Sequence, residues 1–124
     1  MVLVVIGLGG AAGAVARYLV DGLVTQQAAS AFPFGTLVIN LSGSLVLGVL
    51  FALAIERNVL PADIRAPVMV GFLGAYTTFS TLMLQSWLLV ESGAIGMAIL
   101  NVVGSSLLGL LAVLLGLGIG RALA

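Results

Sequence analysis

Long apolar runs separated by short polar segments divide the chain into four parts. The runs cover about residues 2–24, 35–55, 66–89 and 94–119. Each is close to the roughly 20 apolar residues that a helix needs to cross a bilayer. Backbone polar groups that face lipid must be paired within their own segment, so these runs are expected to be helices. The pattern predicts an all-α integral membrane protein, with four transmembrane helices in a single domain over residues 1–124.

Three short segments hold most of the polar and charged residues, and they are the predicted loops: "TQQAASAFPF", "ERNVLPADIRA" and "ESGAI". Pro33 and Pro61 fall within them. Pro67 fits the first turn of the third helix, where its missing N–H costs little.

Small residues recur at a spacing of four, which lets membrane helices approach closely. The pairs are Gly9 and Gly13, Ser44 and Gly48, Ser105 and Gly109, and Gly116 and Gly120. Together they predict a tightly packed bundle.

Composition narrows the function classes. The chain is 62% hydrophobic and 6% charged, whereas an average soluble domain has about a quarter charged residues. It has no Cys and no His, and it shows no pairing of a nucleophile with a base, so an enzyme is not expected. Four arginines without a basic face do not suit nucleic acid. Membrane lipid is the first expected partner.

The arginines give only a weak orientation signal. With four spans, Arg57, Arg65 and Arg121 fall on the side of both termini, and Arg17 falls towards the other side. The positive-inside rule acts through such differences. Since three against one is a small bias, insertion in both orientations is physically possible.

Polar side chains form stripes inside three of the apolar runs. At spacings of four they are Thr36, Asn40 and Ser44; Thr77, Thr81 and Gln85; and Asn101 and Ser105, which Gly109 follows at the same spacing. An unpaired polar group in an apolar medium costs several kcal/mol. The stripes therefore need partners, which are either neighbouring helices or something that passes between them.

The stripes contain donors but no carboxylate, which favours an anion. A cation or proton transporter normally keeps an acid within the membrane. The acids here lie at predicted span ends or in loops, where a solvated or capping role is expected: Asp21, Glu56, Asp63 and Glu91.

The segment "GFLGAYTTFSTLML" (71–84) is typical of a broken membrane helix. Gly71 and Gly74 precede Thr77 and Thr78 near the middle of the third run. Such breaks expose carbonyls that coordinate cations and helix ends that face anions. Phe79, which follows, is either a packing residue or a ring whose positive edge holds an anion.

Arg17 has two interpretations. Its side chain either extends to the membrane interface or supplies positive potential at a vestibule.

Three blocks together resemble the Fluc (CrcB) fluoride channels over essentially the whole chain. They are "GGAAGAVARY" (9–18), "FGTLVINLSGSLVLG" (34–48) and "GFLGAYTTFST" (71–81). The resemblance implies passive, fluoride-selective efflux through a multi-pass protein in the inner (plasma) membrane of a prokaryote. It also implies an antiparallel, dual-topology dimer of two copies, with two pores and a structural sodium ion at the centre of the interface.

The resemblance also assigns roles to individual residues. Backbone carbonyls of Gly74 and Thr77 would hold the sodium. The remaining matches concern the fluoride path: Asn40, with Thr36 one turn before it, as pore residues; Phe79 as the first aromatic; Arg17 in the vestibule; and Ser105 in the fourth helix.

Two positions depart from the family pattern. Leu82 stands where a second Phe is usual, and Asn101 stands where a pore Tyr is usual. Either the anion is held differently there, by Asn101 and the Ser80 or Thr81 hydroxyl, or a homologous second subunit completes the pore. The homodimer is the preferred interpretation.

Two other classes are alternatives. A small multidrug-resistance exporter depends on a glutamate in its first span, and residues 2–20 contain no acid. A non-transporting subunit of a larger membrane complex would fit the glycine pairs but would leave the donor stripes without a purpose.

Overall fold

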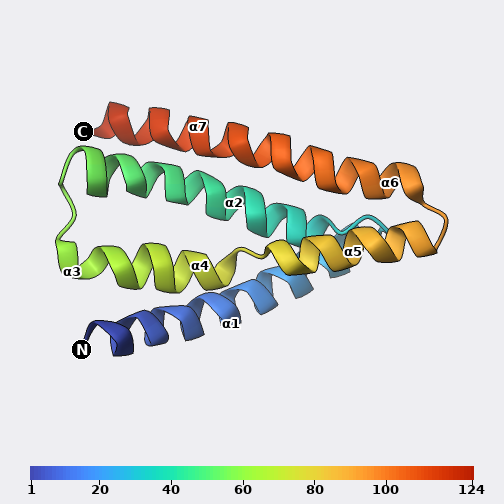
Figure 1. The fold of residues 1–124 in the computed structure, drawn as a ribbon, viewed down its shortest axis with the longest axis horizontal. Helices are drawn as coiled ribbons and strands as arrows, with labels where there is room; N and C mark the ends of the chain where they lie inside the picture. Colours follow the sequence, from blue (N-terminus) through green and yellow to red (C-terminus); the bar gives the residue numbers. More distant parts are fainter.

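Four long helical segments run side by side in the computed structural model, which describes residues 1–124 (Figure 1). The first is α1 (Val2–Ala28), and the second is α2 (Phe34–Phe51) followed by the π-helix η1 (Ala52–Glu56). The third comprises α3 (Ala62–Arg65), η2 (Ala66–Phe72), α4 (Leu73–Tyr76) and α5 (Phe79–Glu91). The fourth comprises α6 (Ile95–Ile99), η3 (Leu100–Gly104) and α7 (Ser105–Leu123). All four are long and apolar enough to cross a membrane, which confirms the predicted all-α, four-span arrangement.

The ends of the helices differ from the predicted ones. α1 continues to Ala28, and Ala29 ends it in the left-handed region (φ 45°), with its N–H donating to the Thr25 carbonyl at 3.1 Å. The third segment begins at Ala62, so the prediction that Pro67 lies in its first turn is wrong. Pro67 lies in η2 instead. Its missing N–H interrupts the regular hydrogen bonding of an α-helix, and a π-helical turn accommodates such an irregularity.

α1 packs against the third segment through glycines. A Cβ atom added at Gly13 would lie 2.9 Å from the carbonyl carbon of Phe72, and one added at Gly71 would lie 2.6 Å from the Ile6 carbonyl oxygen. No side chain fits at these places, so the two backbones lie in direct contact.

α2 and α7 make a second close approach. A Cβ atom added at Gly48 would lie 3.1 Å from the Gly116 Cα, and one added at Gly116 would lie 3.1 Å from the Gly48 Cα. Gly120 meets Val49 and Ala52 one turn further along. The close helix packing predicted from the small-residue pairs is confirmed at these positions.

Replacing Gly116 with alanine is expected to destabilise the bundle, because the new methyl group would meet the Leu45 carbonyl and the Val49 amide. Overpacking of this kind costs about 1–3 kcal/mol. Gly118→Ala on the same helix is the matched control, since nothing lies within 4 Å of its added Cβ. Thermal unfolding in detergent should show a lower midpoint for Gly116→Ala and an equal or higher one for Gly118→Ala. Equal midpoints for the two variants would contradict the packing described.

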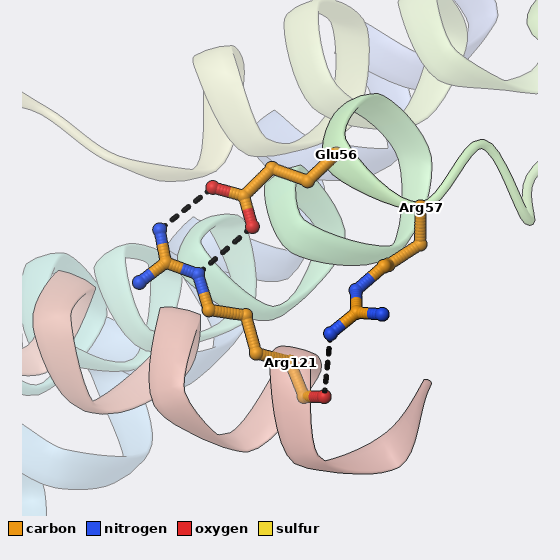
Figure 2. A network of polar contacts seen from close by, with 3 residues as sticks. All are labelled: Glu56, Arg57 and Arg121. Carbon is orange, nitrogen blue, oxygen red and sulfur yellow. Dashed lines mark hydrogen bonds and ion pairs between the residues drawn. The ribbon is translucent and has the colours of Figure 1, made fainter.

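A polar network ties the ends of two helices together at the end of the bundle where both termini lie (Figures 1 and 2). The Arg121 guanidinium donates from Nε and Nη2 to the two Glu56 carboxylate oxygens, at 2.8 and 2.7 Å. Arg57 donates to the Arg121 backbone carbonyl at 3.4 Å. These bonds connect the end of η1 to the last turns of α7, where a basic side chain commonly satisfies a free carbonyl.

The core lies where α2 meets α4. Ile39, Leu73 and Tyr76 form its buried apolar cluster, and the Tyr76 hydroxyl lies 2.9 Å from Ser42 Oγ. Large apolar side chains cover much of the remaining surface, as expected of helices whose solvent is lipid.

Candidate functional site

The backbone leaves the helical conformation at two threonines between α4 and α5. Thr77 has φ −77° and ψ 155°, and Thr78 has φ −149° and ψ 120°, both extended. The Thr77 hydroxyl donates to the Leu73 carbonyl at 2.9 Å. The Thr78 hydroxyl accepts from the Thr81 N–H at 3.4 Å and so caps α5. The threonine side chains thus satisfy backbone groups on both sides of the interruption.

Asn40 on α2 pairs with the backbone of Thr78. Its Oδ1 accepts from the Thr78 N–H at 2.8 Å, and its Nδ2 donates to the Thr78 carbonyl at 3.0 Å. In a continuous α-helix the Thr78 N–H would donate to the Gly74 carbonyl instead. The Asn40 amide therefore takes the place of a helical hydrogen bond and keeps one N–H of its own unused.

Two carbonyls at the interruption are left for other partners. Gly74 loses its usual donor because that N–H is bound to Asn40, and no hydrogen bond reaches the Thr77 carbonyl. The surroundings of Gly74 are open, since nothing lies within 4 Å of an added Cβ. No cluster of His, Cys, Asp or Glu could hold a metal. The donor set therefore fits a cation held by unwound backbone carbonyls, as in sodium sites of transporters.

One cavity, the Ser105 cavity, lies between α2, α5 and α7 and has a volume of about 390 Å³. Four of its lining residues are predicted path residues: Asn40, Phe79, Leu82 and Ser105. Phe79 is 73% exposed in the single chain, whereas Leu82 is buried. Ser44, Thr77, Thr78, Ser106 and Gly109 also line this cavity, and no charged residue does.

A second cavity, the Arg17 cavity, lies between α1, α2 and α5 and has a volume of about 350 Å³. It is lined by Arg17, Tyr18 and Asp21 of α1, together with Thr36, Thr78 and Thr81. The predicted stripe on α2 is therefore divided, with Thr36 here and Asn40 in the Ser105 cavity. Thr78 lines both cavities, which therefore lie next to each other.

Asn101 is directed between helices rather than into either cavity. It is fully buried, and its Nδ2 donates to Ser86 Oγ at 2.9 Å. Ser86 donates in turn to the Leu82 carbonyl at 2.8 Å, and Ser105 Oγ lies 3.5 Å from Asn101 Oδ1. Asn101 and the exposed Ser80 line neither the Ser105 cavity nor the Arg17 cavity. Their proposed contact with an anion stays a prediction.

Thr78 and Asp21 line these cavities but were not among the predicted site residues. Thr78 could have been found from its position before a helix, where a threonine commonly caps. Asp21 was expected near the end of the first span with a solvated or capping role; α1 continues to Ala28, and Asp21 lines the Arg17 cavity within it. Its spacing of four from Arg17, which puts both on one face of a helix, was the available signal.

Comparison with known proteins gives consistent matches. The family described as "CrcB-like protein, Camphor Resistance (CrcB)" matches residues 4–117. A relative from Magnetococcus marinus is 47% identical over 116 residues, which are 94% of each chain. One from Maridesulfovibrio salexigens is 44% identical over 116 residues, 94% of this chain and 92% of the relative. One from Methylococcus capsulatus is 50% identical over 119 residues, 96% of this chain and 52% of the relative. All three relatives are named fluoride-specific ion channel FluC.

Proposed function

This chain belongs to the CrcB family, and we propose that it is a fluoride-selective channel that lets fluoride leave the cell passively across the plasma membrane. Its relatives carry the name of such a channel. The structural observation that supports the proposal most directly is that two cavities lined by hydrogen-bond donors share Thr78 in their walls, beside the interrupted helix.

The lining chemistry suits a small anion. Fluoride is strongly hydrated, so a pore must replace its water with donors at close range, as carbonyls replace the hydration shell of potassium in other channels. The donors here are hydroxyls of Ser44, Thr36 and Thr81 and the unused N–H of Asn40. The absence of any carboxylate from the Ser105 cavity avoids repulsion there. A larger halide would be rejected by size in a narrow path.

We propose that two copies assemble in antiparallel orientation and form two pores. Four helices cannot easily enclose a polar path, and in the single chain Phe79 and Ser80 are exposed beside the interruption. A second copy would cover them and complete the walls of the path. The alternative, a homologous partner subunit, differs in one respect: the chain alone would then carry no flux.

We further propose that the Gly74 and Thr77 carbonyls hold a structural sodium ion at the centre of this dimer. The positive charge of the ion would hold together the interrupted third helical segments of the two copies. Sodium is expected to raise the thermal unfolding midpoint of the detergent-solubilised protein by several degrees. A ligand that binds only the folded state stabilises that state by about 2.7 kcal/mol when the ligand concentration is about 100 times the Kd. N-methylglucamine chloride at equal ionic strength is the control. Equal midpoints in the two salts would contradict the proposed site.

The experiment that tests the function is fluoride efflux from liposomes that contain only this purified chain, measured with a fluoride electrode. We expect rapid fluoride release, with chloride release no faster than from protein-free liposomes. Efflux by the chain alone would also support the homodimer. No fluoride release, or transport of organic cations driven by a proton gradient as in a small multidrug-resistance exporter, would overturn the proposal.

A further inference from the structure

Asp21 lies at the junction of two polar cavities. Besides the Arg17 cavity, it lines a third one, the Gln85 cavity, which has a volume of about 430 Å³. Thr25, Ser30, Gln85 and Ser92 supply further polar groups there. Ser30 is part of the loop that follows α1, and Ser92 follows α5, so this cavity lies at the end of the bundle away from the termini (Figure 1).

The three cavities follow one another along the molecule. The Gln85 and Arg17 cavities share Asp21, and the Arg17 and Ser105 cavities share Thr78. An ion that entered from the Gln85 cavity and continued to the Ser105 cavity would therefore pass Asp21 first and Thr78 second.

The Asp21 carboxylate is largely free to act on such an ion. Its one hydrogen bond is a long one, 3.4 Å from the Thr25 hydroxyl. Arg17, one turn earlier on α1, lines the same cavity, but the two do not form an ion pair, because the Glu56–Arg121 pair is the only salt bridge in the chain. The other acidic residues do not line these three cavities.

We propose that the Gln85 cavity is an entrance to the anion path and that Asp21 limits how strongly Arg17 attracts and holds the entering anion. The inference rests on the proposed fluoride conduction. A free arginine alone would attract fluoride and hold it, whereas conduction requires binding that is weak enough to release the ion. A carboxylate one turn away lowers the local positive potential and so shortens the time that the anion stays.

The test is fluoride efflux of Asp21→Asn at several fluoride concentrations and two ionic strengths. Removing the carboxylate should lower the fluoride concentration that gives half-maximal flux. At low fluoride and about 0.01 M ionic strength, where the screening length is about 30 Å, we expect flux to rise about threefold or more. At about 1 M, where the screening length is about 3 Å, the difference should disappear. Glu91→Gln, which removes an exposed acid at the same end of the bundle, should match the unmodified protein.

Each outcome has a distinct meaning. A gain that salt removes supports the role of Asp21, because a merely structural role would not depend on ionic strength. Flux equal to that of the unmodified protein at both ionic strengths, or reduced at both, overturns the inference and leaves the fluoride channel intact. Absence of flux from the unmodified protein overturns the proposed function and the inference with it.

Discussion

Replacing Asn40 with aspartate is expected to lower fluoride efflux from liposomes by about 100-fold or more. This corresponds to an increase of about 2.8 kcal/mol or more in the free-energy barrier to conduction. Asn40 accepts from the Thr78 N–H and donates to the Thr78 carbonyl. A carboxylate can still accept, but it has no N–H to donate, so the carbonyl 3.0 Å away would face a negative oxygen instead. The new charge would also repel an anion in the Ser105 cavity, which Asn40 lines.

Asn58→Asp is the matched control for this change. Asn58 lies in the loop after η1 with φ 54°, a conformation that aspartate also tolerates, and it is exposed. Its efflux should equal that of the unmodified protein. Size-exclusion profiles of both variants would show whether the proteins remain folded. Undiminished efflux by a folded Asn40→Asp variant would exclude Asn40 from the path.

Replacing Asn101 with leucine is expected to destabilise the bundle by about 1–3 kcal/mol, the usual cost of leaving buried polar groups unpaired. Leucine has a similar size but would leave the Ser86 hydroxyl without its donor and Ser105 without its acceptor. Denaturant titration of the protein in detergent micelles measures the loss. A decrease in efflux is also expected, because Ser105 and Leu82, both connected to Asn101 by this network, line the Ser105 cavity.

A double-mutant cycle with Ser86→Ala gives the internal control. If Asn101 and Ser86 act through their shared hydrogen bond, the double variant should lose clearly less stability than the sum of the single variants. Additive losses would show that the two side chains contribute independently and would contradict the network as described.

The sequence was sufficient to predict the four helices and much of their packing. In lipid, backbone polar groups must be paired within their own segment, so apolar runs of membrane-spanning length form helices. The Gly48 and Gly116 spacings predicted close approach, and the structure places these two residues against each other. The resemblance predicted that Asn40, Phe79 and Ser105 share one path, and the structure brings all three to one cavity.

The direction of Asn101 and the end of α1 were not predictable from polar residues at a spacing of four. Asn101 was expected on the same face as Ser105, and the two side chains lie 3.5 Å apart, but Asn101 lies in η3 and does not line the Ser105 cavity. The direction of Asn101 is also set by Ser86, a residue that is distant in sequence and carries no motif. The end of α1 was predicted too early because the end of an apolar run does not mark the end of a helix, and α1 continues through the polar residues up to Ala28.

The contact between Gly48 and Gly116 also bears on leakage. Because the α2 and α7 backbones touch there, with no side chains between them, neither water nor an ion fits between the two helices at that point. A cell that depends on its membrane potential needs insulation everywhere except along the intended route. These two glycines would thus help to limit ion leakage between the helices, and a bulky replacement that separated α2 from α7 would threaten the proton gradient.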